Sequence, residues 1–159
     1  MLRIMRDHDQ KSADATYKAN AACTTGVAVV KDYANKLAKF PAEATADNIF
    51  FVQKERYATG VKAGYTDLSD YDTVFTSVAS GEFVVLYSFD YDEVFATDAF
   101  TGSTLVDADI GKTVVANTSG LLTPATSTAT SKYLFEGWFT DNGHKLAKIR
   151  VLDTPVANS

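Results

Sequence analysis

The chain has 159 residues, and 15 Lys and Arg against 20 Asp and Glu give a formal net charge of −5. Apolar residues make up 46 % and charged residues 22 %, which is ordinary globular composition for one domain that buries its own core and excludes global disorder. The acidic balance, without a cluster of Lys and Arg, argues against a nucleic-acid partner, because tracking a phosphate backbone requires clustered positive charge.

No apolar run approaches the ~20 residues of a membrane-spanning helix, and residues 1–6 lack the apolar stretch of a signal peptide. We therefore expect no membrane partner and no export by a signal of its own. Cys23 is the one cysteine, so it cannot form an internal disulfide, and no His or basic residue stands near it. We expect a small buried thiol in a protein made in a reducing cytoplasm.

The first 20 residues are polar, rich in charge, and lack both the helical and the strand period. Segments of this kind are commonly disordered until a partner orders them. We predict an extended N-terminal arm over residues 1–20, followed by one domain over residues 21–159. Asp7-His8-Asp9 places an imidazole between carboxylates, but a solvated arm is favoured there over a metal or acid/base site.

Short runs of β-branched and aromatic residues, separated by Gly, Asn, Asp, Ser and Thr, predict an all-β domain. Residues 26–31 and 36–40 predict a hairpin that ends at Pro41. Residues 48–52 are apolar on both faces, which is typical of a central strand covered on both sides. The irregular stretch around residues 54–80 is expected to be a long loop insertion.

Regular strand pattern resumes at residues 82–89, and further strands are expected at 94–96, 112–116 and 121–123. A polar connector rich in Thr, Ser and Ala follows over residues 123–131. Together these segments predict a single compact β-barrel or β-tulip-like domain.

The last hairpin, formed by residues 133–140 and 144–152, has two possible registers around its loop at 141–143. A two-residue loop at Asn-Gly places Glu136 among apolar residues and buries its carboxylate. A three-residue loop with a left-handed glycine gives one wholly apolar face and sets Glu136 opposite Lys148 on the other. We prefer the second register, because side-chain periodicity fixes which face is buried.

The preferred register creates an apolar centre with a charged rim, as binding surfaces often have. The centre consists of Leu134, Trp138 and Leu146. The rim consists of Glu136, Lys148 and Arg150. The alternative, in which the insertion or the N-terminal segment of the same chain covers this patch, stays open.

Motifs for catalysis or cofactor binding are absent from the sequence: it has no Gly-x-Ser-x-Gly elbow and no phosphate-binding glycine loop. We expect no catalytic residue and no cofactor. Asp-x-Asp pairs at 70/72, 90/92 and 107/109 do not follow the twelve-residue calcium loop, so we expect ordinary turn residues and no metal site, with calcium as a minor alternative.

Several tyrosines fall in or beside predicted loops, namely Tyr57, Tyr65, Tyr71 and Tyr91. Tyrosine supplies a large contact area at low entropic cost, which suits contacts with a protein or a carbohydrate. Ordinary anchoring of the loops is the simpler interpretation.

The strand patterns of this chain resemble those of small auxiliary head proteins of tailed bacteriophages. The similar segments are residues 26–30, 36–41, 48–52, 81–84, 137–139 and 148–152. The resemblance covers most of the chain after about Tyr17, and it implies a non-catalytic capsid decoration, or cement, protein. Such a protein is a β-barrel or β-tulip bound to the outside of the shell that the major capsid protein forms.

The resemblance also implies a homo-oligomer, with a trimer favoured, located on the outer surface of the virion after synthesis in the cytoplasm of a bacterial host. An N-terminal arm would then reach the shell. The candidate capsid or oligomer interface residues are Leu134, Trp138, Leu146, Tyr17, Arg3 and Arg6.

Two other function classes stay open. A phage tail, fibre or receptor-binding β-module would show exposed aromatic platforms for sugars. A small hydrolase with an atypical site would need a concave pocket with convergent titratable groups.

Overall fold

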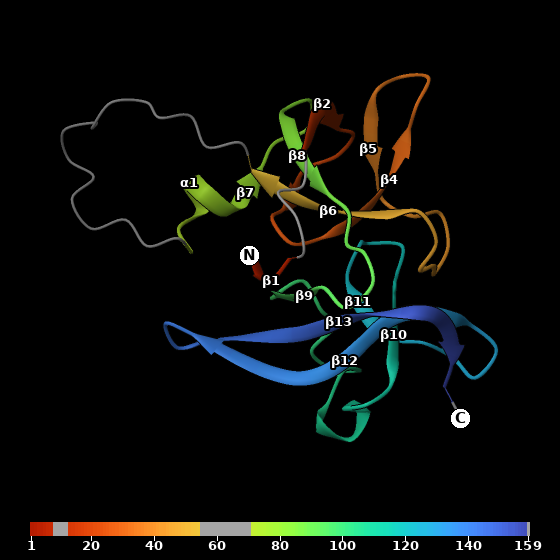
Figure 1. Cartoon of the computed structure of the whole chain (residues 1–159). Helices are drawn as coiled ribbons and strands as arrows, with labels where there is room; N and C mark the ends of the chain where they lie inside the picture. Colours follow the sequence, from red (N-terminus) through yellow and green to blue (C-terminus); the bar gives the residue numbers. More distant parts are fainter. Residues whose placement is uncertain (8–12, 55–70, 159) are drawn as a thin grey trace.

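Strands dominate the computed structural model, which describes residues 1–7, 13–54 and 71–158 (Figure 1). The elements in chain order are β1 (Leu2–Arg6), β2 (Asp14–Ala19), β3 (Cys23–Thr24), β4 (Ala28–Asp32), β5 (Leu37–Lys39), β6 (Ile49–Lys54), α1 (Thr73–Thr76), β7 (Ser77–Val78), β8 (Phe83–Tyr87), β9 (Val94–Thr97), the 3₁₀ helix η1 (Asp107–Asp109), β10 (Thr113–Ala116), β11 (Leu122–Pro124), β12 (Thr130–Asp141) and β13 (His144–Ala157). The predicted all-β class is confirmed.

The strands form two main assemblies. Strands β2-β5-β4-β6-β8 close into a barrel, and β1-β9-β13-β12-β10-β11 form a six-stranded sheet. Neighbouring barrel strands are antiparallel except for β2 and β5, which run parallel. Figure 1 shows the long β12–β13 hairpin crossing below the barrel strands. The predicted barrel is therefore confirmed, and a second sheet packs beside it.

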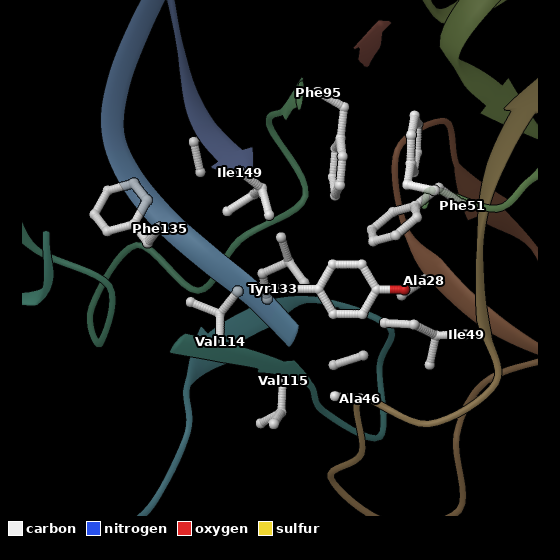
Figure 2. Packing of buried hydrophobic residues seen from close by; sticks show 14 of the residues in the cluster. Ala28, Ala46, Ile49, Phe51, Phe95, Val114, Val115, Tyr133, Phe135 and Ile149 are labelled. Carbon is white, nitrogen blue, oxygen red and sulfur yellow. The ribbon is translucent and has the colours of Figure 1, made fainter. Parts of the chain in front are cut away.

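Strand β6 joins the two assemblies because its two faces serve different cores. Phe51 points to the sheet, where its ring lies 4.4 Å from Phe95, 5.6 Å from Phe89 and 5.8 Å from Tyr133 (Figure 2). Val52, the next residue, lies in the cluster that fills the barrel. Both side chains are fully buried. The prediction of a central strand covered on both sides is confirmed.

The predicted N-terminal arm is wrong. Strand β1 pairs with β9 at one edge of the six-stranded sheet, and β2 pairs with β5 and β8 to close the barrel. Leu2, Tyr17 and Ala19 are buried. Each strand is only five or six residues long and carries charged residues on its exposed face, so its alternation is too short to stand out in a polar stretch.

The predicted insertion around 54–80 falls largely outside the described residues, since 55–70 are not described. The described remainder contains α1 and β7, and β7 pairs with β3.

The final hairpin contains both registers that the sequence allows. Asp141 pairs with His144, so the loop has two residues, Asn142 at φ 48° and Gly143 at φ 83°. Positive φ at both central residues is the type I′ geometry that matches the twist of a hairpin. Our preference for a three-residue loop is therefore wrong at the turn.

A β-bulge at Glu136 changes the register further along. Gly137 pairs with Lys148 on the turn side of the bulge, whereas Phe135 pairs with Ile149 beyond it, in the register that we preferred. The extra residue reverses which side chains face the core. Glu136 itself lies beside Lys148 on the solvent side, as predicted.

Candidate protein-binding face around Trp138

The bulge turns Trp138 toward the core side of the sheet, where neighbours fix its ring. Phe135 lies 4.8 Å from it and Phe100 5.1 Å, measured between ring centroids. The indole Nε1 donates a hydrogen bond of 2.6 Å to Asp107 Oδ1, and Lys145 Nζ lies 3.6 Å from the ring centroid. Trp138 remains half-buried. The ring is thus held in one orientation at the edge of the core.

The segment around η1 builds the rest of this surface. The buried Asp109 carboxylate accepts hydrogen bonds from Lys112 Nζ at 2.9 Å and from the backbone N–H of Val106 at 3.0 Å, and these bonds lower its pKa. The turn so fixed leaves Val106 45 % exposed and Ile110 49 % exposed. Ile110 packs over Gly137, where a Cβ would lie 3.5 Å from Ile110 Cδ1.

Trp138 and Val106 are among the residues that line a shallow hollow of about 530 Å³. Its lining is Phe100, Gly102, Leu105, Val106, Asp107, Ala108, Trp138 and Lys145. We define the Trp138 face as Phe100, Val106 and Trp138, with Asp107 and Lys145 at its rim. An apolar floor with one anion and one cation at the edge suits an inserted aliphatic or aromatic side chain from a protein partner.

Charged side chains around Glu136 form a network on the opposite side of the hairpin. Glu136 forms ion pairs with Arg150 and, at 2.9 Å, with Lys148. Arg150 also pairs with Asp92, and Asp92 forms a further ion pair with Arg6 at 2.7 Å. Burial raises the pKa of Glu136, but the hydrogen bonds from Arg150 and Lys148 outweigh it, so that its pKa lies below the usual value. Each of these five charged side chains is thus paired within the network.

Most of the predicted interface residues do not lie on the Trp138 face. Leu146 is fully buried beside Met1 and Ala96, and Tyr17 is 3 % exposed in the barrel cluster. Both predictions are wrong. Leu146 lies with its partner Phe139 on the face opposite Trp138, where it packs with Met1, and β2 is a barrel strand. Leu134 faces away from Trp138, since it adjoins the inward-facing Phe135 and neighbouring residues of a strand alternate.

The two predicted arginines also lie elsewhere. Arg3 Nε donates to Asp141 at 2.6 Å, which ties β1 to the hairpin tip. Arg6 is about half exposed and belongs to the Asp92 network. Sequence reasoning missed Phe100 and Val106. The available signal for Val106 was a second large apolar residue, Ile110, four positions along in an Asp-rich loop without strand alternation.

The titratable side chains of Glu93 and Cys23 have structural contacts. Glu93 is buried and accepts a 2.6 Å hydrogen bond from the backbone N–H of Asp90. Burial, with the nearby Glu82 charge, raises the pKa of Cys23 to about 11, so its thiol stays protonated. Among the described residues, no group of three or more His, Cys, Asp and Glu is placed to hold a metal ion. His8 of the Asp-His-Asp motif lies outside them.

The loop tyrosines divide into anchors and exposed rings. Tyr71 stacks on His144 at 3.6 Å and donates a 2.9 Å hydrogen bond to Asp141. Burial and this bond raise the pKa of Tyr71 to about 12. Tyr91 is 61 % exposed, while Tyr57 and Tyr65 lie outside the described residues.

No family model matches the chain, and neither a curated protein nor a solved structure does. In the part of the chain that the structure describes, no helix is both long and apolar enough to cross a membrane.

Proposed function

We propose that this chain is a non-catalytic structural protein that binds the outside of a tailed-phage capsid through the Trp138 face and stabilises the shell. Its strand patterns support this through their resemblance to auxiliary head proteins, and the partner is then the major capsid protein. The observation that carries the proposal is the hollow lined by the half-buried rings of Phe100 and Trp138 and by the exposed side chain of Val106.

The geometry favours binding of a protein surface by this face. Burial of apolar area stabilises a contact by about 25 cal/mol per Å². Trp138 is already held by Phe135, Phe100 and Asp107, so that little side-chain freedom remains to be lost when a partner covers it. An aromatic anchor surrounded by aliphatic neighbours and a polar rim is the usual arrangement of an energetic centre in a protein interface.

Stabilisation follows from binding by mass action. A protein that binds the assembled shell, and not its separated subunits, adds its own binding free energy to the cost of opening the shell. Copies that each bridge several subunits multiply this effect. A homo-oligomer, with a trimer favoured by the resemblance, would supply such bridging and forms part of the proposal.

The proposal is tested by co-sedimentation of the purified chain with undecorated shells of the same virus. We expect saturable binding and a higher temperature of shell disassembly. Binding should persist as salt is raised, because an apolar contact is screened little compared with exposed ion pairs. Absence of saturable binding at low salt, or of any rise in disassembly temperature when binding is saturated, would overturn the proposal.

A further inference from the structure

A second hollow, of about 450 Å³, lies on the barrel away from the Trp138 residues. Tyr33, Glu43, Asp47 and Asn48 are among its lining residues. A neighbouring hollow of about 310 Å³ shares Asp47 and Asn48 and continues to Lys132. We call the two together the Tyr33 groove. Their volumes lie in the range of small-ligand sites.

Tyr33 is the most exposed of the large hydrophobic side chains that the structure describes, at 67 %. The turn that carries it is built by Asp32, whose carboxylate accepts a 2.9 Å hydrogen bond from Asn35 Nδ2 and pairs with Lys39 at 2.6 Å. The ring meets Tyr17 edge to face, with centroids 6.5 Å apart. Tyr33 is therefore an aromatic surface on a fixed turn.

The loop opposite Tyr33 is anchored from below. Pro41, Ala46 and Ile49 are buried, and Figure 2 shows Ala46 and Ile49 among the residues of the aromatic cluster. Thr45 exchanges two backbone hydrogen bonds with Ala116, at 2.9 and 2.8 Å. The backbone that carries the polar side chains of the groove is thus preformed.

The polar side chains of the groove point outward and are open to a ligand. Glu43, Asp47 and Asn48 are exposed, and none of their side chains has a hydrogen bond or ion pair with any residue in 1–7, 13–54 or 71–158. The lining has two cations, and both are already engaged. Lys31 pairs with Asp14 at 2.6 Å and lies 4.2 Å from the centre of the Phe50 ring, and Lys132 Nζ donates a 3.3 Å hydrogen bond to the carbonyl of Phe89. Two carboxylates and one amide remain.

We propose that the Tyr33 groove binds a neutral oligosaccharide. The apolar face of a sugar ring would lie on Tyr33, and its hydroxyls would donate to the Glu43 and Asp47 carboxylates, while the Asn48 amide both donates and accepts. Two open carboxylates repel an anionic sugar. The two neighbouring hollows together extend beyond one ring, which favours a chain of sugars. This site is independent of the Trp138 face.

The test is a titration of the isotope-labelled full chain, followed by amide chemical shifts, with cellohexaose, maltohexaose and N-acetylchitohexaose. A heparin hexasaccharide is the anionic comparison. We expect saturable shifts around Tyr33, Asp47 and Asn48 with at least one neutral sugar and none with heparin. Absence of saturable shifts with all three neutral sugars would overturn the inference, as would shifts centred on the Trp138 face.

Variants separate ring stacking from a general surface effect. Tyr33→Ala should weaken binding of the active sugar by about tenfold, whereas Tyr33→Phe should retain it. Tyr91→Ala removes a ring of similar exposure outside the groove and should bind as the wild type does. Equal affinity of the Tyr33→Ala and Tyr91→Ala variants would contradict the assignment. Shell binding should be the same in all of these variants, so failure here is distinct from failure of the proposed function.

Discussion

The barrel interior and the seam between barrel and sheet use different side chains. Apart from Tyr17, the buried side chains of the barrel cluster are small or aliphatic, among them Ala19, Val27, Val29, Ala38, Val52, Val78, Val84 and Leu86. The seam is aromatic, with Phe51, Phe89, Phe95, Tyr133 and Phe135 (Figure 2). A closed barrel of five strands has a narrow lumen that small side chains fill, whereas two facing sheets are about 10 Å apart and need larger ones.

This difference matters for function because both candidate binding surfaces rest on the seam. Trp138 packs on Phe135, and the loop of the Tyr33 groove is anchored through Ala46 and Ile49, which belong to the same cluster. Loss of seam packing should therefore loosen both surfaces. Loss of barrel packing should act mainly on stability.

The largest effect is expected from Phe51→Ala. The ring contacts three other aromatic rings, and its removal leaves a cavity that should lower the free energy of unfolding by about 3–5 kcal/mol. Val52→Ala, one residue along on the barrel face, should cost only about 2 kcal/mol. Urea unfolding followed by far-ultraviolet circular dichroism measures both. Equal losses would contradict the distinction between seam and barrel interior.

Gly120→Ala should have the next largest effect. Gly120 has φ 73°, its carbonyl accepts the N–H of Ala28 at 2.8 Å, and an added Cβ would overlap the Ala28 carbonyl oxygen. We expect a loss of about 2–4 kcal/mol, from strain plus displacement of the backbone at the seam.

Gly111→Ala is the matched comparison for this position. Gly111 also has positive φ, at 90°, but an added Cβ would meet nothing within 4 Å. Strain alone should cost about 1 kcal/mol. If thermal unfolding showed the same loss of stability for both variants, the close approach of Gly120 to the Ala28 carbonyl would make no contribution of its own.

The smallest effect concerns acid stability of the barrel surface. Hydrogen bonds from Lys31 and Thr16 lower the pKa of Asp14 to about 2. A carboxyl whose pKa is lower in the folded state than in the unfolded state stabilises the fold at any pH above its unfolded-state pKa of about 3.9. This contribution is lost as the pH falls toward the folded-state pKa of about 2. The wild type should therefore lose about 1 kcal/mol more of its free energy of unfolding on acidification than Asp14→Asn does, after allowance for solvent screening.

Urea unfolding between about pH 5 and pH 2 measures the slope for the wild type, Asp14→Asn and Lys31→Met. Both variants should show a flatter slope than the wild type. An unchanged slope in Asp14→Asn would show that the pair with Lys31, at 2.6 Å, does not contribute.

The parts of the fold that could be predicted are those with strong local periodicity. The run at 48–52 identified β6 as covered on both faces, and turn chemistry located the β12–β13 hairpin. Strands β1 and β2 were missed because each contributes few buried residues and gains its place only by pairing with β9 and β8. The bulge at Glu136 was missed because the sequence analysis assumed one register along the whole hairpin, whereas the hairpin has one register on each side of the bulge.

The candidate site was only partly predictable for a related reason. Trp138 stood out because a large aromatic ring beside charged residues is locally visible in the sequence. Val106 is brought to it by the turn at η1, and Phe100 by packing of its ring against Trp138. Contacts between segments tens of residues apart leave no local period, so no reading of one segment reveals them.

The most direct test of the central claim compares two surface substitutions in shell co-sedimentation. Val106→Asp places a charge on the Trp138 face, whereas Val74→Asp does so on α1, and the two wild-type valines are 45 % and 50 % exposed. With both variants folded, we predict that Val106→Asp binds shells at least about tenfold more weakly, equivalent to about 1.4 kcal/mol, while Val74→Asp binds as the wild type does. Equal binding by the two variants would contradict the account.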